Sequence, residues 1–124
     1  MIIRASEMTI DNEEQLKGGR GTVKVLNFLD KKDSYGAGRL FGISTIKPGD
    51  SIGYHRHVGD FEVYYFLKGE ARVNDNGNET ILKPGDSMMC REGESHGIEN
   101  IGAEDLVYVS LILYPHNLSA VENS

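Results

Sequence analysis

Short strand-like segments separated by tight turns recur along this chain and limit the folds it can adopt. We count about eight to ten segments of four to eight residues that are rich in β-branched, aromatic or alternating apolar residues. The 124-residue chain contains 15 glycines, as expected of short strands joined by tight turns. Asn76 and Gly77 lie between two such segments, and this dipeptide is the strongest short-range signal of a β-hairpin. We therefore expect an all-β fold, a sandwich or small barrel, with almost no helix.

The sequence Lys-Pro-Gly-Asp occurs twice, at residues 47–50 and 83–86, and a serine follows it each time. Nothing else in the two halves aligns as well, so we interpret the copies as two similar hairpin corners and not as a duplicated domain. The length suits one domain with one core. We expect an N-terminal arm at residues 1–21, a barrel at 22–114 and a tail at 115–124. Within the arm, Asp11 or Asn12 could cap one turn of helix.

Charge and composition exclude some classes of partner. The net charge is −6, the isoelectric point is near 5.1, and the basic residues are scattered, which argues against nucleic-acid binding. No apolar run approaches the roughly 20 residues of a membrane-spanning helix. The single cysteine, Cys90, can form no internal disulfide, and residues 1–7 have neither the apolar core nor the cleavage site of a signal peptide. We expect a cytoplasmic protein.

Potential metal ligands are concentrated in residues 49–69. His55 and His57 lie two positions apart, so in a strand both imidazoles point to the same face. Glu62 begins the next segment after a short Gly-Asp turn, and its carboxylate can therefore lie across from the two rings. His96, after a second glycine-rich passage, is a fourth candidate. Three imidazoles and one carboxylate suit a divalent first-row transition metal.

The order and spacing of these residues resemble the two sequence motifs of the cupin family. The first motif is a glycine, His-x-His, a glutamate and a second glycine, and it is matched by Gly49, His55, His57, Glu62 and Gly69. The second motif is matched by Gly85, Gly93, His96 and Asn100. Arg91 stands where the family usually has a proline, which is the one departure from the pattern.

The resemblance implies a double-stranded β-helix, or jelly-roll barrel, in which these three histidines and the glutamate hold one metal ion. The metals common in the family are manganese, iron, nickel, cobalt, copper and zinc. Three neutral imidazoles and one carboxylate leave a divalent ion with a net charge near +1 and with open positions, so the centre would attract anions. A small polar or anionic metabolite is therefore the expected ligand.

Other side chains could line a substrate pocket beside the metal. By strand alternation Tyr64 shares the face of Glu62, and its phenol could donate a hydrogen bond at the metal, which makes Tyr64 our catalytic candidate. The full set of candidate pocket residues is Arg39, Phe41, Tyr64, Phe66 and Arg72. Core packing and surface exposure are the simpler interpretations for most of these. Cys90 could point toward the metal but is expected to be a small buried residue, and His116 is expected to be exposed and not a ligand.

Two classes of function stay open. Family members of this size include dioxygenases, decarboxylases of the oxalate type, isomerases and lyases, and the resemblance selects none of them. The alternative is a non-catalytic module that binds a sugar, a metal or a metabolite. A complete ligand set with open metal positions favours the enzyme. Cupins commonly dimerise by exchanging or pairing N-terminal strands, and the apolar residues 1–3 suit that arrangement, so we expect a homodimer.

Overall fold

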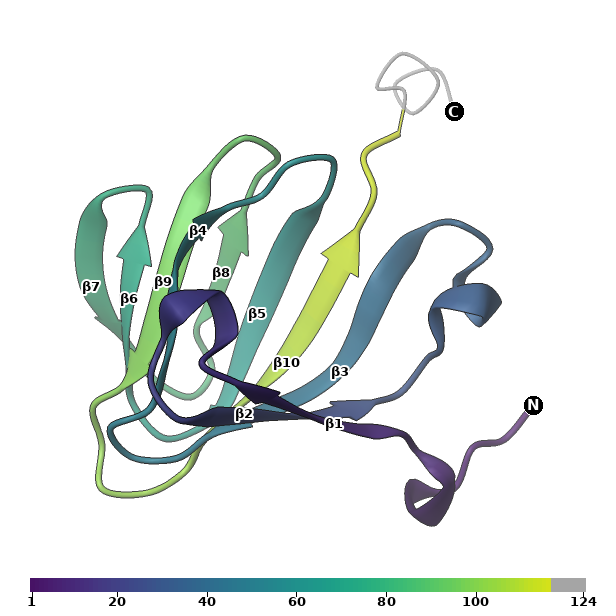
Figure 1. Ribbon diagram of the computed structural model, residues 1–124, viewed down its shortest axis with the longest axis horizontal. Helices are drawn as coiled ribbons and strands as arrows, with labels where there is room; N and C mark the ends of the chain where they lie inside the picture. The colour runs from purple at the N-terminus through teal and green to yellow at the C-terminus, as the bar shows by residue number, and fades with distance from the viewer. Residues whose placement is uncertain (117–124) are drawn as a thin grey trace.

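The computed structural model describes residues 1–116, which form two antiparallel β-sheets that face each other (Figure 1). The larger sheet contains, in spatial order, β1 (Ile10–Glu14), β2 (Thr22–Asn27), β3 (Gly38–Ile46), β10 (Leu106–Leu113), β5 (Phe61–Lys68) and β8 (Ser87–Cys90). The smaller sheet contains β4 (Ser51–Arg56), β9 (Ser95–Asn100), β6 (Ala71–Asp75) and β7 (Asn78–Leu82). Within residues 1–116 the helical segments are three short 3-10 turns, η1 (Ala5–Glu7), η2 (Leu16–Gly18) and η3 (Lys31–Ser34). The all-β prediction is confirmed.

From β3 onward the chain passes back and forth between the two sheets. β3, β5, β8 and β10 belong to the larger sheet, while β4, the β6–β7 hairpin and β9 belong to the smaller one. This path winds the sheets around a common interior, as in a jelly roll. Because the connections cross from one sheet to the other, segments distant in sequence line the same interior. Among the described residues, no helix has the length and apolar character needed to span a membrane.

The core lies between the sheets and is built by side chains at every second position of the strands. β10 shows the pattern most clearly, because Leu106, Tyr108, Ser110 and Ile112 are all buried while their neighbours point outward. Phe66 of β5 is completely buried, and its ring centroid lies 5.5 Å from that of Tyr108. Aromatic rings at this separation pack favourably beyond the area they bury.

The two Lys-Pro-Gly-Asp sequences form matching turns, as the repetition predicts. In each turn the amide of the aspartate donates to the carbonyl of the lysine, from Asp50 to Lys47 at 3.0 Å and from Asp86 to Lys83 at 3.0 Å. The glycines Gly49 and Gly85 have φ angles of +83° and +94°. Glycine adopts such angles without the steric cost of a Cβ atom, which explains the residue at this position of both turns.

The N-terminal arm differs from the expectation. The predicted helical turn at Asp11 or Asn12 is wrong, because both residues lie in β1 and pair with Val25 and Lys24 of β2. The Asp11 carboxylate accepts a hydrogen bond from the Asn27 side chain at 2.9 Å and is thus used across the strands and not as a cap. Residues 117–124 of the predicted tail lie outside the described residues.

The segment that follows β1 folds over one end of β4. A Cβ atom on Gly53 of β4 would lie only 1.9 Å from the carbonyl oxygen of Lys17, so the absence of a side chain at Gly53 allows η2 to sit directly on this strand. Gln15 and Lys17 both have left-handed backbone conformations, with φ angles of 49° and 56°. The close approach places Leu16 and Lys17 beside the interior cavity described below.

Candidate metal centre

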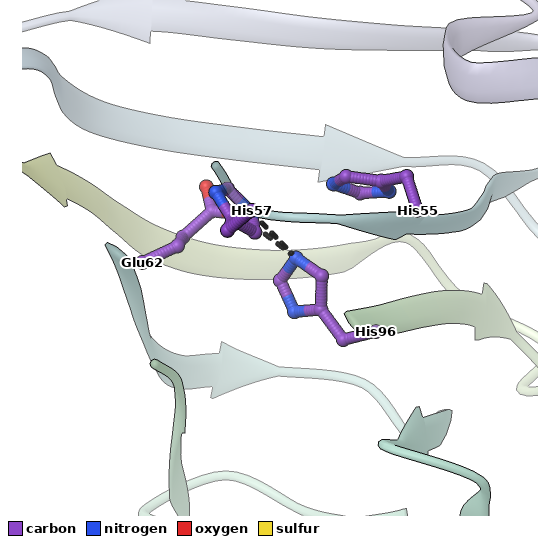
Figure 2. A group of neighbouring side chains, drawn as sticks. All are labelled: His55, His57, Glu62 and His96. Atoms are coloured by element: carbon purple, nitrogen blue, oxygen red, sulfur yellow. Dashed lines mark hydrogen bonds and ion pairs between the residues drawn. The ribbon is translucent and has the colours of Figure 1, made fainter. Parts of the chain in front are cut away.

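The four predicted ligands come from three neighbouring segments and meet inside the sandwich (Figure 2). His55 of β4 is paired in register with His96 of β9, and His57 follows directly after the end of β4. Glu62 extends from β5 in the opposite sheet. One donor atom from each residue lies within 4.8 Å of the others. His57, Glu62 and His96 are buried, and His55 is half-buried at the edge of the group.

Three of the donor atoms are spaced like adjacent ligands of one ion. The Nε2 atoms of His57 and His96 are 3.0 Å apart, and they lie 3.2 Å and 3.1 Å from the Oε1 atom of Glu62. Bonds of about 2.0–2.2 Å to one ion place donors at neighbouring octahedral corners about 3 Å apart. The two nitrogens can approach this closely because one carries a proton or because both direct lone pairs at a shared cation.

Hydrogen bonds on the far side of two rings fix which nitrogen faces the group. Nδ1 of His55 donates to the carbonyl oxygen of Gly53 at 2.7 Å, and Nδ1 of His57 donates to Oδ1 of Asp60 at 2.6 Å. Because a carbonyl or carboxylate can only accept here, both rings carry their proton on Nδ1 and leave the Nε2 lone pair available for a metal. Carboxylate partners of this kind also raise the basicity of a ligating imidazole.

Ionisation in the group favours metal binding. Burial alone would raise the pKa of Glu62, but in the metal-free protein hydrogen bonds from His57 and His96, donated when their Nε2 atoms are protonated, outweigh it and lower this pKa to about 2. The hydrogen bond to Glu62 is also the main reason that the pKa of His57 is raised, whereas burial lowers the pKa of His55. Glu62 is therefore a carboxylate near neutral pH, and its charge attracts a proton or a cation to the neighbouring imidazole.

The donor set fits a divalent transition metal. Nitrogen and carboxylate donors suit such ions, two of the three histidines are held in the ligating tautomer, and three donors have the spacing of a coordination shell. Nδ1 of His96 is buried without a hydrogen-bond partner in the described structure, so this ring is oriented by packing, with Tyr64 stacked at 5.2 Å. The cluster formed by His55, His57, Glu62 and His96 is able to bind a metal.

A cavity of about 330 Å³ lies beside the cluster. His55 and Glu62 line one part of it, and Ser44, Ser110, Tyr64 and Tyr108 add hydroxyl groups. Leu16, Val23, Val25, Leu40, Ile52 and Ile112 supply apolar walls. Lys17 and Arg39 also line the cavity, together with the acidic residues Asp11 and Glu13 of β1. The volume and the mixed lining are those of a site for a small polar molecule.

The structure divides the five residues predicted for the pocket. Tyr64 and Arg39 line the cavity, and Nε of Arg39 donates to Oδ2 of Asp60 at 2.8 Å. Phe66 lies elsewhere, because strand alternation buries it completely in the core. Phe41 points to the outer face of the larger sheet, where it packs edge-to-face on Phe28. Arg72 is on the outer face of the smaller sheet and pairs with Glu99 at 3.2 Å. The pocket assignments of these last three are corrected accordingly.

Sequence reasoning missed Asp60, Tyr108 and the serine pair. Asp60 lies in the turn between the histidines and Glu62, where an aspartate is ordinary and gives no sign of its contact with His57. Tyr108, Ser110 and Ser44 were recognisable in principle. Each occupies an inward position of an otherwise apolar alternating strand, where a hydroxyl needs a partner or a ligand.

Two further expectations are answered by the placement of Cys90 and His116. Cys90 is fully buried, and burial raises the pKa of its thiol to about 11, which fits the small buried residue expected. It pairs in register with Glu62 across β5 and β8. His116 is exposed after the end of β10 and is not part of the cluster.

Arg91 makes use of the amide hydrogen that a proline would lack. Its backbone N–H donates to Oε1 of Glu94 at 3.0 Å, and the amide of Glu94 returns a hydrogen bond to the carbonyl of Arg91 at 3.0 Å. The Glu94 carbonyl in turn accepts from the amide of His57 at 2.9 Å. The turn at the departing position is therefore closed by hydrogen bonds and supports the backbone of His57.

Two facing sheets wound as a jelly roll, with three histidines and one glutamate gathered inside, define a double-stranded β-helix protein with a cluster able to bind a metal. Residues 42–112 match the family profile described as the cupin domain, which is more than half of the chain. The chain belongs to the cupin family.

Individual relatives agree with this assignment. The chain is 40% identical over 113 residues to the oxalate-binding protein of Thermotoga maritima, a match that covers 91% of this chain and 93% of that one. It resembles the crystal structure of a predicted oxalate decarboxylase from Thermotoga maritima with a TM-score of 0.87 and 39% identity, over 93% of this chain and 100% of the other. The cupin domain of Schizosaccharomyces pombe Cnp3 has a TM-score of 0.69 at 15% identity over 93% of this chain and 73% of that one, and shares the fold.

Proposed function

We propose that this protein binds one divalent transition metal through His55, His57, Glu62 and His96 and uses that centre to hold a small dicarboxylic acid of the oxalate type. The observation that carries the proposal is the cluster itself, four potential ligands gathered beside a cavity of about 330 Å³. The name of the Thermotoga maritima relative, an oxalate-binding protein, supports the choice of acid.

The bound metal would supply positive charge and Lewis acidity to a carboxylate. The surrounding residues do the rest. Leu16 and Ile52 present apolar surface that limits access of water, and Lys17 and Arg39 add positive charge beside the cavity. Tyr64 is the proposed catalytic residue: burial raises the pKa of its hydroxyl well above 10, so it stays protonated and can donate a hydrogen bond to the acid.

We infer that the centre acts as an enzyme on this acid, with decarboxylation as the first reaction to test. Asp11 and Glu13 support this choice because they place carboxylates that can exchange protons in the wall of the same cavity. Dioxygenase, isomerase and lyase reactions on related small acids belong to the same proposal. Binding without turnover is the second candidate, and it is favoured by the name of the oxalate-binding relative.

The experiment begins with the metal content of protein purified without added metal, measured by inductively coupled plasma mass spectrometry. Oxalate is then titrated calorimetrically into the metal-loaded protein, and formate and carbon dioxide are assayed on the same sample. We expect about one metal per chain and saturable oxalate binding, both lost in His57→Ala. Formate production identifies the enzyme, and binding without products identifies the second candidate. Absence of metal and of oxalate binding in the wild type refutes the proposal.

We also propose that two copies of the chain form a homodimer through the outer face of the larger sheet. Outward side chains of paired strands form two adjacent apolar rows there, Ile10, Leu26, Ile43, Val109 and Tyr65 in one and Phe41, Leu111, Val63 and Met89 in the other. β1, from the predicted arm, forms one edge of this face.

The fully buried thiol of Cys90 suits a reducing compartment, and we propose the cytoplasm.

The exposed apolar area matches what a stable dimer requires. The large apolar side chains of this face remain substantially exposed: Ile10 49%, Phe41 38%, Tyr65 47%, Leu67 44% and Met89 44%. At about 200 Å² for a fully exposed large side chain, they present roughly 400 Å² of apolar surface. One side of a standard interface buries about 800 Å², of which a little over half is apolar.

Sedimentation equilibrium tests the dimer. We expect a dimer for the wild type at about 50 μM, and a monomer for the double variant Tyr65→Glu, Met89→Glu, because charges would be buried without partners. Ile81→Glu, at a 49% exposed residue of β7 in the other sheet, is the matched control and should stay dimeric. A monomeric wild type refutes the proposal, as does a double variant that remains dimeric.

A further inference from the structure

One buried hydroxyl in the cavity has no use within the protein. Tyr108 lies in the middle of β10 with 0% of its surface exposed, and its Oη atom has no hydrogen-bond partner among the described residues. Polar atoms buried in this way are nearly always satisfied in folded proteins, because an unpaired one keeps the full cost of leaving water. The exception requires an explanation, and the position of Tyr108 on the wall of the cavity provides one.

The groups packed around Tyr108 do not hydrogen-bond to its hydroxyl. Ser44 lies opposite it in β3, but the Oγ atom of Ser44 is hydrogen-bonded to that of Ser110 at 2.8 Å. The Tyr64 ring packs against Tyr108 with a centroid separation of 4.6 Å and also stacks on His96 at 5.2 Å. Tyr108 is thus one aromatic ring removed from the metal cluster, on the wall of the cavity that His55 and Glu62 also line.

The hydroxyl row formed by Ser44, Ser110 and Tyr108 has hydrogens to donate to a ligand. One serine hydroxyl donates to the other, which leaves the second serine with a free hydrogen, and Tyr108 adds another. Burial raises the pKa of Tyr108 far above its ordinary value, so its proton is always present. A carboxylate, whose two oxygen atoms only accept when it is ionised, can satisfy both donors.

We propose that Tyr108 is a specificity-determining residue whose hydroxyl donates a hydrogen bond to the carboxylate of the bound acid that lies away from the metal centre. This inference rests on the proposed function and deepens it, since it selects acids with two polar ends over those with one. The metal cluster would hold one end, and the hydroxyl row would hold the other. Tyr108 therefore determines which acid is bound and not whether metal is bound.

The test is the variant Tyr108→Phe, which removes one oxygen atom and preserves the ring. We expect oxalate affinity in the metal-loaded protein, measured by calorimetry, to fall at least about tenfold, because a hydrogen bond to a charged group is lost. Formate affinity should change less than about twofold, so the preference for oxalate over formate collapses. Metal affinity of the variant should equal that of the wild type. Tyr35→Phe, at a fully exposed tyrosine, is the matched control.

The stability of the metal-free and ligand-free protein separates this role from a structural one. Removing an unpaired buried hydroxyl should leave the urea midpoint of Tyr108→Phe unchanged or raise it. A clearly lower midpoint would mean that the hydroxyl has a partner within the protein, and it would overturn the inference. So would a variant that binds oxalate as tightly as the wild type. If the wild type binds neither oxalate nor formate, the proposed function fails, and this inference fails with it.

Discussion

The carboxylate of Asp60 should set the metal affinity of the centre although it is not one of the four candidate ligands. It is 7% exposed, accepts the Nδ1 hydrogen of His57 at 2.6 Å, and is itself held by Arg39 at 2.8 Å. Removing such a partner from a ligating histidine costs about 10–100-fold in metal affinity, or roughly 1.4–2.7 kcal/mol. Two substitutions of Asp60 should give losses of metal affinity at opposite ends of this range, because only one of them keeps a hydrogen-bond acceptor for His57.

Asp60→Asn keeps an oxygen that can still accept from His57 but removes the charge, so we expect a loss near tenfold. Asp60→Ala leaves the buried Nδ1 hydrogen without a partner, and the loss should approach 100-fold. Arg39 reaches His57 through Asp60 and is half exposed, so the effect of Arg39→Gln should be smaller than that of either Asp60 variant. The order of the three effects is as informative as their size.

The assay is a competition titration of Mn²⁺ and Co²⁺ against a chelator at pH 7.5, with stoichiometry measured on the same samples. Asp105→Asn is the matched control, because this aspartate is exposed and outside the cluster. Circular dichroism and urea unfolding establish that each variant is folded. Wild-type affinity in Asp60→Ala would refute the reasoning, since it would mean that the His57–Asp60 contact does not orient a metal ligand.

Three other outcomes follow from particular contacts. The pKa of Glu62 falls from 4.5 in the reference state to about 2 in the fold, so its ionisation stabilises the fold fully above pH 4.5 and no longer does so near pH 2. The free energy of unfolding of the metal-free protein, measured in urea, should therefore fall by about 3 kcal/mol between pH 4.5 and pH 2. In Glu62→Gln the fall over the same pH range should be much smaller. Asn100→Ala removes a buried amide that donates to the carbonyl oxygens of Ile46 and Glu104, so the free energy of unfolding should drop by about 2–4 kcal/mol while metal affinity stays unchanged. A loss of metal affinity as large as the loss of stability would contradict this prediction. Gly53→Ala forces a Cβ atom against the Lys17 carbonyl and should destabilise by about 1–3 kcal/mol in thermal unfolding, more than Gly97→Ala, where the nearest atom is 3.2 Å away.

The sequence allows the strands and corners to be predicted because their signals are local. Alternation of buried positions along β10 and the two Lys-Pro-Gly-Asp turns depend on residues within a few positions of each other. The arm could not be predicted in this way. Residues 10–14 contain three acidic side chains and only one large apolar residue, and they form a strand because β2 offers an edge with which to pair.

The cluster was predictable because a fixed spacing brings its members together, whereas the pocket depends on packing between distant segments. Alternation places Phe66 on the face of Glu62 and Tyr64, but alternation does not tell how far along the strand the cavity ends and the core begins. Arg72 alternates to the outer face of β6, beside Glu99 of β9, a contact that only the register between the two strands reveals. Tyr108 becomes informative only when its missing hydrogen-bond partner is seen.

The most direct test of the central claim is the anomalous difference map of a crystal grown from protein loaded with Mn²⁺. We predict one dominant peak per chain, about 2.2 Å from the Nε2 atoms of His55, His57 and His96 and from a carboxylate oxygen of Glu62. A map without a peak at this position, or with its strongest peak among the acidic residues of the surface, would contradict it.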